Sequence, residues 1–314
     1  MKKYIGVDIG GMSIKIGLVN EEGSLLDKTV VKTESGAESV IKSLGEGLVT
    51  FLEKNGLTEK DVEGVGIGCP GAVTGKTGVV EYSNNLGWKN VRLVDGLKKY
   101  VDVPYKLSND ANVAALGEVI FGAAKGYENV VMFTLGTGVG GGIIIDKKLY
   151  EGNESKGAEL GHAVLVLGGE ECTCGRKGCI EAYCSASALI RDTKRAMLAD
   201  TDSKMWEYAN NDINNVNGRT AFAMARENDE SALKVVNDYI MYLSESIMNY
   251  CNIFRPEAFV LGGGICGEGK FLIDRIVKYC EERHYGYQGT PAVKILTATL
   301  GNDAGIIGAA ALLV

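Results

Sequence analysis

Basic residues, prolines and long apolar runs are all scarce in this sequence. Lys and Arg number 33 against 40 Asp and Glu, which gives a formal net charge of −7. Binding of nucleic acid through its phosphates relies on clustered Lys and Arg, and no basic patch is evident. No stretch approaches the roughly 18 uninterrupted apolar residues of a membrane span, and the apolar run after Met1 is too short for a signal peptide. We therefore expect neither a nucleic-acid nor a membrane partner.

The cysteines do not follow the pattern of a disulfide framework. The chain has 314 residues and eight cysteines, and five of these are scattered through apolar or helical sequence: Cys69, Cys184, Cys251, Cys266 and Cys280. A chain of this length can bury a sizeable core, in two domains rather than one, without covalent cross-links. We therefore expect reduced thiols and a cytoplasmic location.

Glycine is abundant where proline is rare. The chain has 43 glycines and four prolines, so glycine usage is about twice the average. Glycine adopts positive φ and lets the backbone approach other groups closely. This composition fits a ligand that is held by main-chain loops.

Four potential soft-metal ligands lie close together in the sequence: His162, Cys172, Cys174 and Cys179. Three thiolates and one imidazole suit tetrahedral zinc, and a complete set of four protein ligands indicates a structural site. The alternative is a set of buried cysteines beside a core histidine, but a core does not need Cys-x-Cys-x4-Cys among glycines and charges. Glu159 and Glu181 bracket the set, so a metal that folds this segment would also position two carboxylates. The segment is therefore predicted to form part of a binding site.

A glycine turn joins the first two predicted strands. Apolar runs at 4–7, 14–19 and 25–31 predict a β-meander, and the first turn carries Asp8, Gly10, Gly11, Ser13 and Lys15. The turn is equally compatible with a plain hairpin. Free amides beside a carboxylate at a strand end would also form a phosphate loop with a metal-facing acid.

The same pattern recurs in the middle of the chain. A predicted strand at 130–135 is followed by the glycine-rich run Gly136–Gly142 and a strand at 143–145. A Gly-x-Gly-x-Gly run is a weak signal alone, and here it joins two strands instead of opening a helix. That context excludes the usual dinucleotide-binding fingerprint. A hairpin whose amides surround phosphates fits better.

Two further strand ends carry candidate site residues. Asn109 and Asp110 follow a predicted strand at 105–108 and open a helix, where a side chain can reach a ligand at the carboxyl end of the sheet. Either residue could instead cap the helix. Gly262–Gly264 follow a strand at 258–261, which fits either a flat ligand against the backbone or an ordinary strand-to-helix turn. Most of the chain from 186 to 254 has apolar residues at helical spacing.

These motifs together resemble the repressor, open-reading-frame and kinase (ROK) family of bacterial sugar kinases, with glucokinases the most similar. The resemblance spans nearly the whole chain and rests on Asp8–Gly11, Gly68–Gly71, Asn85–Trp88, Asn109–Asn112, Leu135–Gly142, Glu159–His162, Cys172–Glu181 and Leu261–Gly264. It implies an α/β protein of the actin-like ATPase fold, with two RNase-H-like domains around a central cleft. The smaller domain would comprise residues 1–118 and 301–314, and the larger one 119–300. A homodimer is also implied.

The resemblance further implies transfer of the γ-phosphoryl group of ATP to the 6-hydroxyl of a hexose. Glucose is the hexose that the resemblance favours. N-acetylmannosamine, N-acetylglucosamine, fructose and allose kinases share most of the same residues. Asp110 would be the catalytic base, and the hexose would be bound by Gly71, Asn85, Asn109, Asp110, Glu159, His162 and Glu181. ATP, with Mg²⁺ near Asp8, would be bound by Asp8, Gly10, Gly11, Ser13, Lys15, Gly136, Thr137, Gly138, Gly140 and Gly263. Structural zinc would be held by His162, Cys172, Cys174 and Cys179.

One position departs from the family pattern. The family usually has Thr after the two glycines of the first loop, and this chain has Met12, which cannot hydrogen-bond a phosphate. Ser13 or the backbone would replace the missing hydrogen bond to the phosphate. We therefore expect weaker ATP binding and retained activity.

Two alternatives to a kinase remain open from the residues. Sugar-responsive repressors of the same family carry an added N-terminal DNA-binding segment, for which the position of Asp8 leaves no room. A sugar-binding relative without catalysis would not need Asp110 and both phosphate loops. We therefore expect an active kinase.

Overall fold

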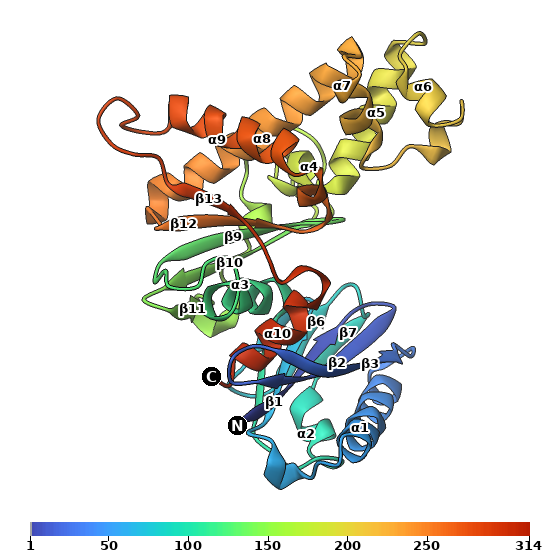
Figure 1. Ribbon diagram of the computed structural model, residues 1–314. Helices are drawn as coiled ribbons and strands as arrows, with labels where there is room; N and C mark the ends of the chain where they lie inside the picture. The colour runs from blue at the N-terminus through green and yellow to red at the C-terminus, as the bar shows by residue number, and fades with distance from the viewer. Residues whose placement is uncertain (1) are drawn as a thin grey trace. The chain divides into compact units, whose positions relative to one another are not determined.

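The computed structural model describes residues 2–314, which divide into two compact units (Figure 1). The first unit contains the residues up to Val130, together with Gly142–Ala158 and Ala298–Val314. The second contains Val131–Gly141 and Glu159–Thr297. Each unit is described separately below.

A five-stranded sheet in the order β3-β2-β1-β4-β8 forms the centre of the first unit. Its strands are β1 (Lys3–Ile9), β2 (Ser13–Asn20), β3 (Leu25–Lys32), β4 (Val65–Cys69) and β8 (Tyr105–Asn109). The first three strands are antiparallel and form the predicted meander, whereas β4 and β8 run parallel to β1. The carboxyl ends of β1, β4 and β8 therefore share one edge of the sheet.

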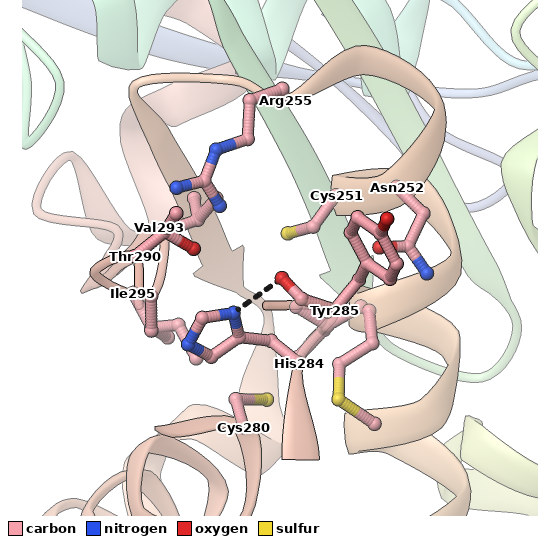
Figure 2. A pocket seen from close by; sticks show the side chains of 12 residues that line it. Cys251, Asn252, Arg255, Cys280, His284, Tyr285, Thr290, Val293 and Ile295 are labelled. Atoms are coloured by element: carbon pink, nitrogen blue, oxygen red, sulfur yellow. Dashed lines mark hydrogen bonds between the residues drawn. The ribbon is translucent and has the colours of Figure 1, made fainter. Parts of the chain in front are cut away.

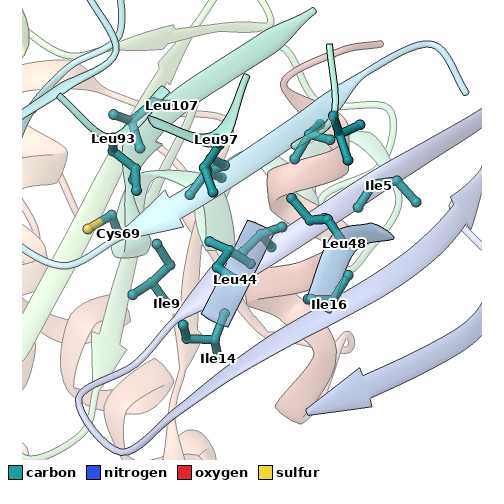
Figure 3. Packing of buried hydrophobic residues seen from close by; sticks show 14 of the residues in the cluster. Ile5, Ile9, Ile14, Ile16, Leu44, Leu48, Cys69, Leu93, Leu97 and Leu107 are labelled. Carbon is teal, nitrogen blue, oxygen red and sulfur yellow. The ribbon is translucent and has the colours of Figure 1, made fainter. Parts of the chain in front are cut away.

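Alternation along β1 separates the two faces of this sheet. Ile5, Val7 and Ile9 are buried in a core with Leu44 of α1 (Ala37–Lys54). Figure 3 shows Ile5, Ile9 and Leu44 in this core. Helix α2 (Leu93–Leu97) contributes to the same core. Helix α1 ends before Gly56, which has φ +64° as the predicted glycine cap requires.

The other face of the sheet is covered by α10 (Ala304–Ala311), which also packs on α3 (Asp110–Ile120). A Cβ at Gly6 of β1 would lie only 1.9 Å from the Ile306 carbonyl oxygen. A Cβ at Gly308 would lie 1.9 Å from the carbonyl oxygen of Val113 in α3. Backbone contact this close leaves no room for a side chain, so part of the glycine surplus serves packing and not ligand binding.

A buried carboxylate fixes the segment that leads into α10. Glu118 of α3 is fully buried and accepts hydrogen bonds from the backbone N–H groups of Ala123 (2.8 Å), Thr299 (2.9 Å) and Leu300 (2.9 Å). Charge-assisted hydrogen bonds of this kind are needed to offset the burial of a carboxylate. Glu118 therefore anchors residues 299–300 to α3.

Three further strands of the first unit form a small sheet. The small sheet has the order β5-β6-β7, with β5 (Ala72–Thr74), β6 (Val79–Ser83) and β7 (Trp88–Val91). Trp88 and Val80 are buried against the core of the unit.

The second large sheet has the order β11-β10-β9-β12-β13, which repeats the strand order of the first. Its strands are β9 (Val130–Leu135), β10 (Val139–Ile145), β11 (Lys148–Tyr150), β12 (Ala258–Gly262) and β13 (Lys294–Thr297). Strand β10 begins at Val139, four residues before the predicted strand. Gly140–Gly142 are therefore strand residues, and the glycine loop is limited to Gly136–Gly138.

The α-helices of the second unit are α4 (Glu181–Cys184), α5 (Ala186–Ala199), α6 (Met205–Tyr208), α7 (Thr220–Arg226), α8 (Glu230–Phe254) and α9 (Lys270–Arg283). Four of them, α4, α5, α7 and α9, pack on the long helix α8, and α6 packs on α7. Phe133 of β9 makes edge-to-face contacts with Phe259 of β12 and Tyr250 of α8, which fixes the helix on the sheet. Within residues 2–314, none of the helices has both the length and the hydropathy that crossing a membrane would require.

Candidate active site

The first glycine loop joins β1 and β2 beside an ion pair. Asp8 and Lys15 are paired in the strand register, and their side chains form a salt bridge of 3.2 Å. Lys15 also donates to the carbonyl oxygen of Asn302 (3.1 Å). Gly305, in the first turn of α10, lies so close to Asp8 that a Cβ there would be 2.6 Å from its carboxyl carbon. The Asp8 side chain thus packs against the start of α10.

Two hydrogen bonds close the first loop and fix the backbone of Gly10. Gly10 N–H donates to the Ser13 carbonyl oxygen (3.0 Å), and the Thr33 hydroxyl donates to the Gly10 carbonyl oxygen (2.7 Å). Gly11 is exposed, and Met12 is 88% exposed. The Met12 side chain therefore points away from the core, and the Gly11 backbone at the tip is exposed.

The structure distinguishes the roles of Asn109 and Asp110. Asn109 caps α3, because its side-chain oxygen accepts from Ala111 N–H (2.9 Å), and its amide donates to the Gly71 carbonyl oxygen (3.1 Å). Asp110 is the first residue of α3 and is partly exposed, with Oδ1 also accepting from Ala111 N–H. The capping role falls to Asn109, which leaves Asp110 with a carboxylate at the strand end.

Asn85 and Cys69 complete this part of the first unit. Asn85 is exposed in the turn between β6 and β7, and a Cβ at Gly11 would lie 3.8 Å from its carbonyl oxygen. Cys69 ends β4, the strand between β1 and β8. Burial raises the pKa of its thiol, and the negative charges of Asp110 and Asp8 raise it further. Cys69 is therefore a neutral thiol beside two carboxylates.

The second glycine loop, Gly136–Gly138, is fixed by the residues that follow the cysteine cluster. Ala186 N–H donates to the Gly136 carbonyl oxygen (2.8 Å), and the Ser187 hydroxyl donates to the Thr137 carbonyl oxygen (2.8 Å). The backbone N–H of Val139 donates to Oε2 of Glu181 (3.1 Å). Three hydrogen bonds thus hold a short loop against the start of α4 and α5. Ser187 was not among the predicted site residues, because a serine near a helix start is usually read as a capping residue.

A cavity of about 580 Å³ adjoins this loop. It is lined by Leu135, Gly136, Thr137, Ala186, Tyr208, Asn217, Gly218, Arg219, Gly264, Ile265 and Glu268. Gly263, the predicted adenosine contact, is the residue before Gly264 and is not itself in the lining. It has φ +95°, and its backbone packs on that of Leu135. No site residue was predicted at 208–219, where the pattern indicates helix and polar connector. The turn signal at Asn217-Gly218 could have indicated a loop, but not the surface that this loop faces.

The four predicted zinc ligands converge. Their donor atoms all lie within 4.8 Å of one another, with Nδ1 of His162 3.6 Å from Sγ of Cys172 and the sulfur atoms of Cys174 and Cys179 3.7 Å apart. In tetrahedral zinc with ordinary bond lengths, two sulfurs lie about 3.8 Å apart and a sulfur and a nitrogen about 3.6 Å apart. The chain folds these donors at the spacing that zinc requires, which fits a structural zinc site.

The predicted hexose ligands of the second unit surround this cluster. Glu159 is exposed and precedes a short turn, Leu160–His162, that Tyr250 fixes by donating to the Leu160 carbonyl oxygen (2.7 Å). Glu181 accepts from the hydroxyl of Thr173 (2.7 Å) within the cysteine loop. Because Glu181 also accepts from Val139, one carboxylate connects the cysteine cluster with the second glycine loop.

The predicted site residues thus form one group in each unit. The first group contains Asp8, Gly10, Gly11, Ser13, Lys15, Gly71, Asn85, Asn109 and Asp110. The second contains Gly136, Thr137, Gly138, Gly140, Glu159, His162, Cys172, Cys174, Cys179, Glu181 and Gly263. Gly140 lies in β10 and not in the loop.

A model of the ROK family matches residues 4–314. The chain belongs to the ROK family. It is 36% identical to the glucokinase of Thermotoga maritima, over 99% of this chain and 97% of that protein. This confirms the resemblance that the motifs indicated.

Solved structures agree with this membership. A ROK family glucokinase from Streptomyces griseus in complex with glucose and AMPPNP is 36% identical, with a TM-score of 0.83 over 99% of this chain and 98% of that one. A ROK hexokinase from Thermus thermophilus is 32% identical, with a TM-score of 0.80 over 98% and 97%. The predicted α/β fold of the actin-like ATPases is therefore confirmed.

Proposed function

We propose that this ROK protein is an ATP-dependent hexose kinase that phosphorylates the 6-hydroxyl of glucose. Full-length similarity to glucokinases supports the activity, as does a similar enzyme solved with glucose and AMPPNP. The observation that carries the proposal is the arrangement around Asp110. Asn109 caps the helix and binds Gly71, so the neighbouring carboxylate is presented at the strand end.

Asp110 is the group that we assign to proton transfer. Phosphoryl transfer has a loose transition state, so a kinase mainly aligns the reacting groups and neutralises charge. An ionised Asp110 at the N-terminus of α3 would accept the proton of the attacking hydroxyl. Asn109, Gly71 and Asn85 in the first unit, with Glu159, His162 and Glu181 in the second, are the proposed hexose contacts.

The glycine loops at Gly10–Gly11 and Gly136–Gly138 are the proposed phosphate-binding groups. The cavity beside Gly136 and Thr137 is the proposed site of the adenosine. Mg²⁺, when bound, would neutralise phosphate charge, and Asp8 is the carboxylate that we assign to it. Zinc, bound by His162 and the three cysteines, would fold the segment that carries Glu159 and Glu181.

A coupled ADP-release assay over a hexose panel tests both the reaction and its substrate. The panel contains glucose, fructose, allose, N-acetylglucosamine and N-acetylmannosamine. We expect glucose to give the highest kcat/KM. A higher value for another sugar would retain the kinase and replace the substrate, whereas no sugar-dependent ADP release would contradict the proposed function.

We also propose that the protein is a homodimer, as the family resemblance implies. Sedimentation velocity of the purified protein at micromolar concentration tests this. A species with the mass of two chains is expected, and a monomer across the concentration range would contradict it.

A further inference from the structure

A second cavity, remote in sequence from the motifs above, lies at the ends of α8 and α9. It has a volume of about 220 Å³ and lies within the second unit. Its lining comes from the last turns of α8, from the residues after α9 and from the segment before β13: Ile247, Met248, Cys251, Asn252, Arg255, Cys280, His284, Tyr285, Thr290, Ala292, Val293 and Ile295. Figure 2 shows these side chains around the open space.

The charge of this cavity has one sign. Its lining contains no Asp or Glu, and Arg255 is its one permanently charged side chain. Arg255 uses Nη2 to donate to the Pro291 carbonyl oxygen (2.7 Å), and its other guanidinium N–H groups make no further hydrogen bond within residues 2–314. The guanidinium therefore retains donors that could bind an anion in bidentate fashion.

His284 contributes a second polar atom from a buried position. The residue is only 6% exposed, and its Nδ1 lies 3.1 Å from the carbonyl oxygen of Tyr285, as the dashed line in Figure 2 marks. A carbonyl can only accept, so Nδ1 carries the hydrogen. No hydrogen bond to Nε2 forms within the described chain, and the ring lines both this cavity and an adjoining hollow of about 560 Å³. Nε2 is therefore an acceptor that a donor group in the cavity could reach.

The backbone around Arg255 is also unusual. Arg255 ends α8 in the left-handed region, at φ 43° and ψ 55°, where glycine is the common residue. A non-glycine residue is strained in this conformation. This conformation directs the chain into β12 and sets Arg255 at the rim of the cavity.

Apart from Asn252, Tyr285 and Thr290, the remaining lining carries no strong hydrogen-bonding group. Met248, Val293 and Ile295 offer no hydrogen bonds, and burial raises the pKa of Cys251 to about 11 and of Cys280 to about 12, so both thiols stay neutral. A polyol such as a sugar phosphate would leave the hydroxyls that face Met248, Val293 and Ile295 unpaired. An acyl or aromatic body would bury its surface there.

We propose that this cavity is a binding site for a small organic carboxylate with an apolar body. The carboxylate pairs with the Arg255 guanidinium at the rim, and the body packs on Met248 and Ile295. Where the ligand carries a hydroxyl, that hydroxyl donates to Nε2 of His284. The site is separate from the proposed hexose and nucleotide contacts, none of which lines this cavity.

Titration calorimetry of the full-length, zinc-loaded protein with hexanoate tests the proposal, with hexanamide and inorganic phosphate as comparison probes. We expect saturable binding of hexanoate, and binding of the neutral amide weaker by about tenfold or more, which corresponds to the loss of one charge-assisted pair. Arg255→Met should remove hexanoate binding. Arg283→Met is the matched control, because Arg283 ends α9 close to the cavity in sequence, pairs with Glu282 and does not line the cavity.

A second variant tests the cavity without changing the charge of Arg255. Ala292→Phe places a ring into the partly exposed wall and should block hexanoate while leaving glucokinase turnover unchanged. Saturable binding that is lost in Arg255→Met and Ala292→Phe and kept in Arg283→Met supports the site. Failure of hexanoate to saturate, equal binding of phosphate, or unchanged binding in Arg255→Met would each overturn it.

Discussion

Asn109 and Asp110 are adjacent residues with similar capping preferences, yet they occupy different positions at the start of α3. Asn109 is the N-cap and Asp110 is the first helical residue. Both suit a helix N-cap, so sequence alone leaves the choice open. Asn109 can both accept from the helix and donate to the Gly71 carbonyl oxygen, and an ionised carboxylate could not make the second bond. The amide is therefore the better cap at this turn, which is consistent with our proposal that Asp110 is the catalytic base.

Replacing Asp110 with Asn should separate catalysis from binding. The variant keeps the size of the side chain but cannot accept a proton, so we expect kcat to fall by roughly two to four powers of ten. Glucose binding, measured by calorimetry, should change little. Asp95→Asn, which alters an exposed acid paired with Arg92 on α2, is the matched control. Near-normal turnover in Asp110→Asn would contradict the assignment of the base.

At the scale of elements, the start of α5 acts on the second glycine loop. The Ser187 hydroxyl donates to the Thr137 carbonyl oxygen, and Ala186 N–H donates to Gly136. Neither residue is a proposed contact of the phosphates. They position the loop, and their contribution should appear in nucleotide binding more than in hexose binding.

We expect Ser187→Ala to raise KM for ATP several-fold while leaving KM for glucose nearly unchanged. One neutral hydrogen bond contributes about 0.5–1.5 kcal/mol, which corresponds to a factor of about 2 to 12. Steady-state kinetics with each substrate varied in turn measures the split. Ser43→Ala, which removes a similar hydroxyl-to-carbonyl bond in α1, should change neither constant. Equal effects on both KM values would indicate general loosening and not positioning of the loop.

The cysteine loop is a second element whose effect extends beyond its own residues. Cys174→Ala removes one of four zinc ligands, so we expect loss of bound zinc, a lower Tm and a higher KM for glucose. Because Glu181 joins this loop to Val139, KM for ATP should also rise. Zinc content by emission spectroscopy, thermal unfolding and kinetics measure these effects. Unchanged folding and glucose affinity after complete zinc removal would contradict a structural role.

At the scale of the whole molecule, motifs with a required chemistry were predictable and surfaces made by folding were not. The convergence of His162, Cys172, Cys174 and Cys179 follows from their spacing, and the meander follows from alternating apolar residues. The lining at 208–219 is not predictable in this way, because a polar connector has the same composition whether it faces solvent or a cavity. The surplus of glycine likewise suggested ligand-binding loops, and only the packing of α10 shows that Gly6 and Gly308 serve backbone contact.

The distribution of thiols over the whole molecule gives a prediction about reactivity. All eight cysteines are free, and the five outside the zinc set are buried. Burial raises the pKa of Cys184, Cys266 and Cys280 to about 12, and the thiolate is the reactive form. We expect no rapid reaction of the zinc-loaded protein with an aromatic disulfide reagent, rapid reaction of the three zinc ligands after chelation, and reaction of all eight in denaturant. Rapid labelling of Cys184 or Cys266 in folded protein would contradict the buried arrangement.

Because of the same buried thiols, the free energy of unfolding should depend on pH in the alkaline range. The thiol of an unfolded chain has its ordinary pKa of 9.0, whereas burial in the native state raises the pKa of Cys184 to about 12. The unfolded state therefore loses protons first as the pH rises, so the contribution to stability is complete below about pH 9 and is lost between about pH 9 and pH 12. Urea unfolding at about pH 8 and about pH 10 should show a lower free energy of unfolding at the higher pH. Cys184→Ala, with one fewer buried thiol, should show a smaller decrease, and an equal decrease would place the titrating groups elsewhere.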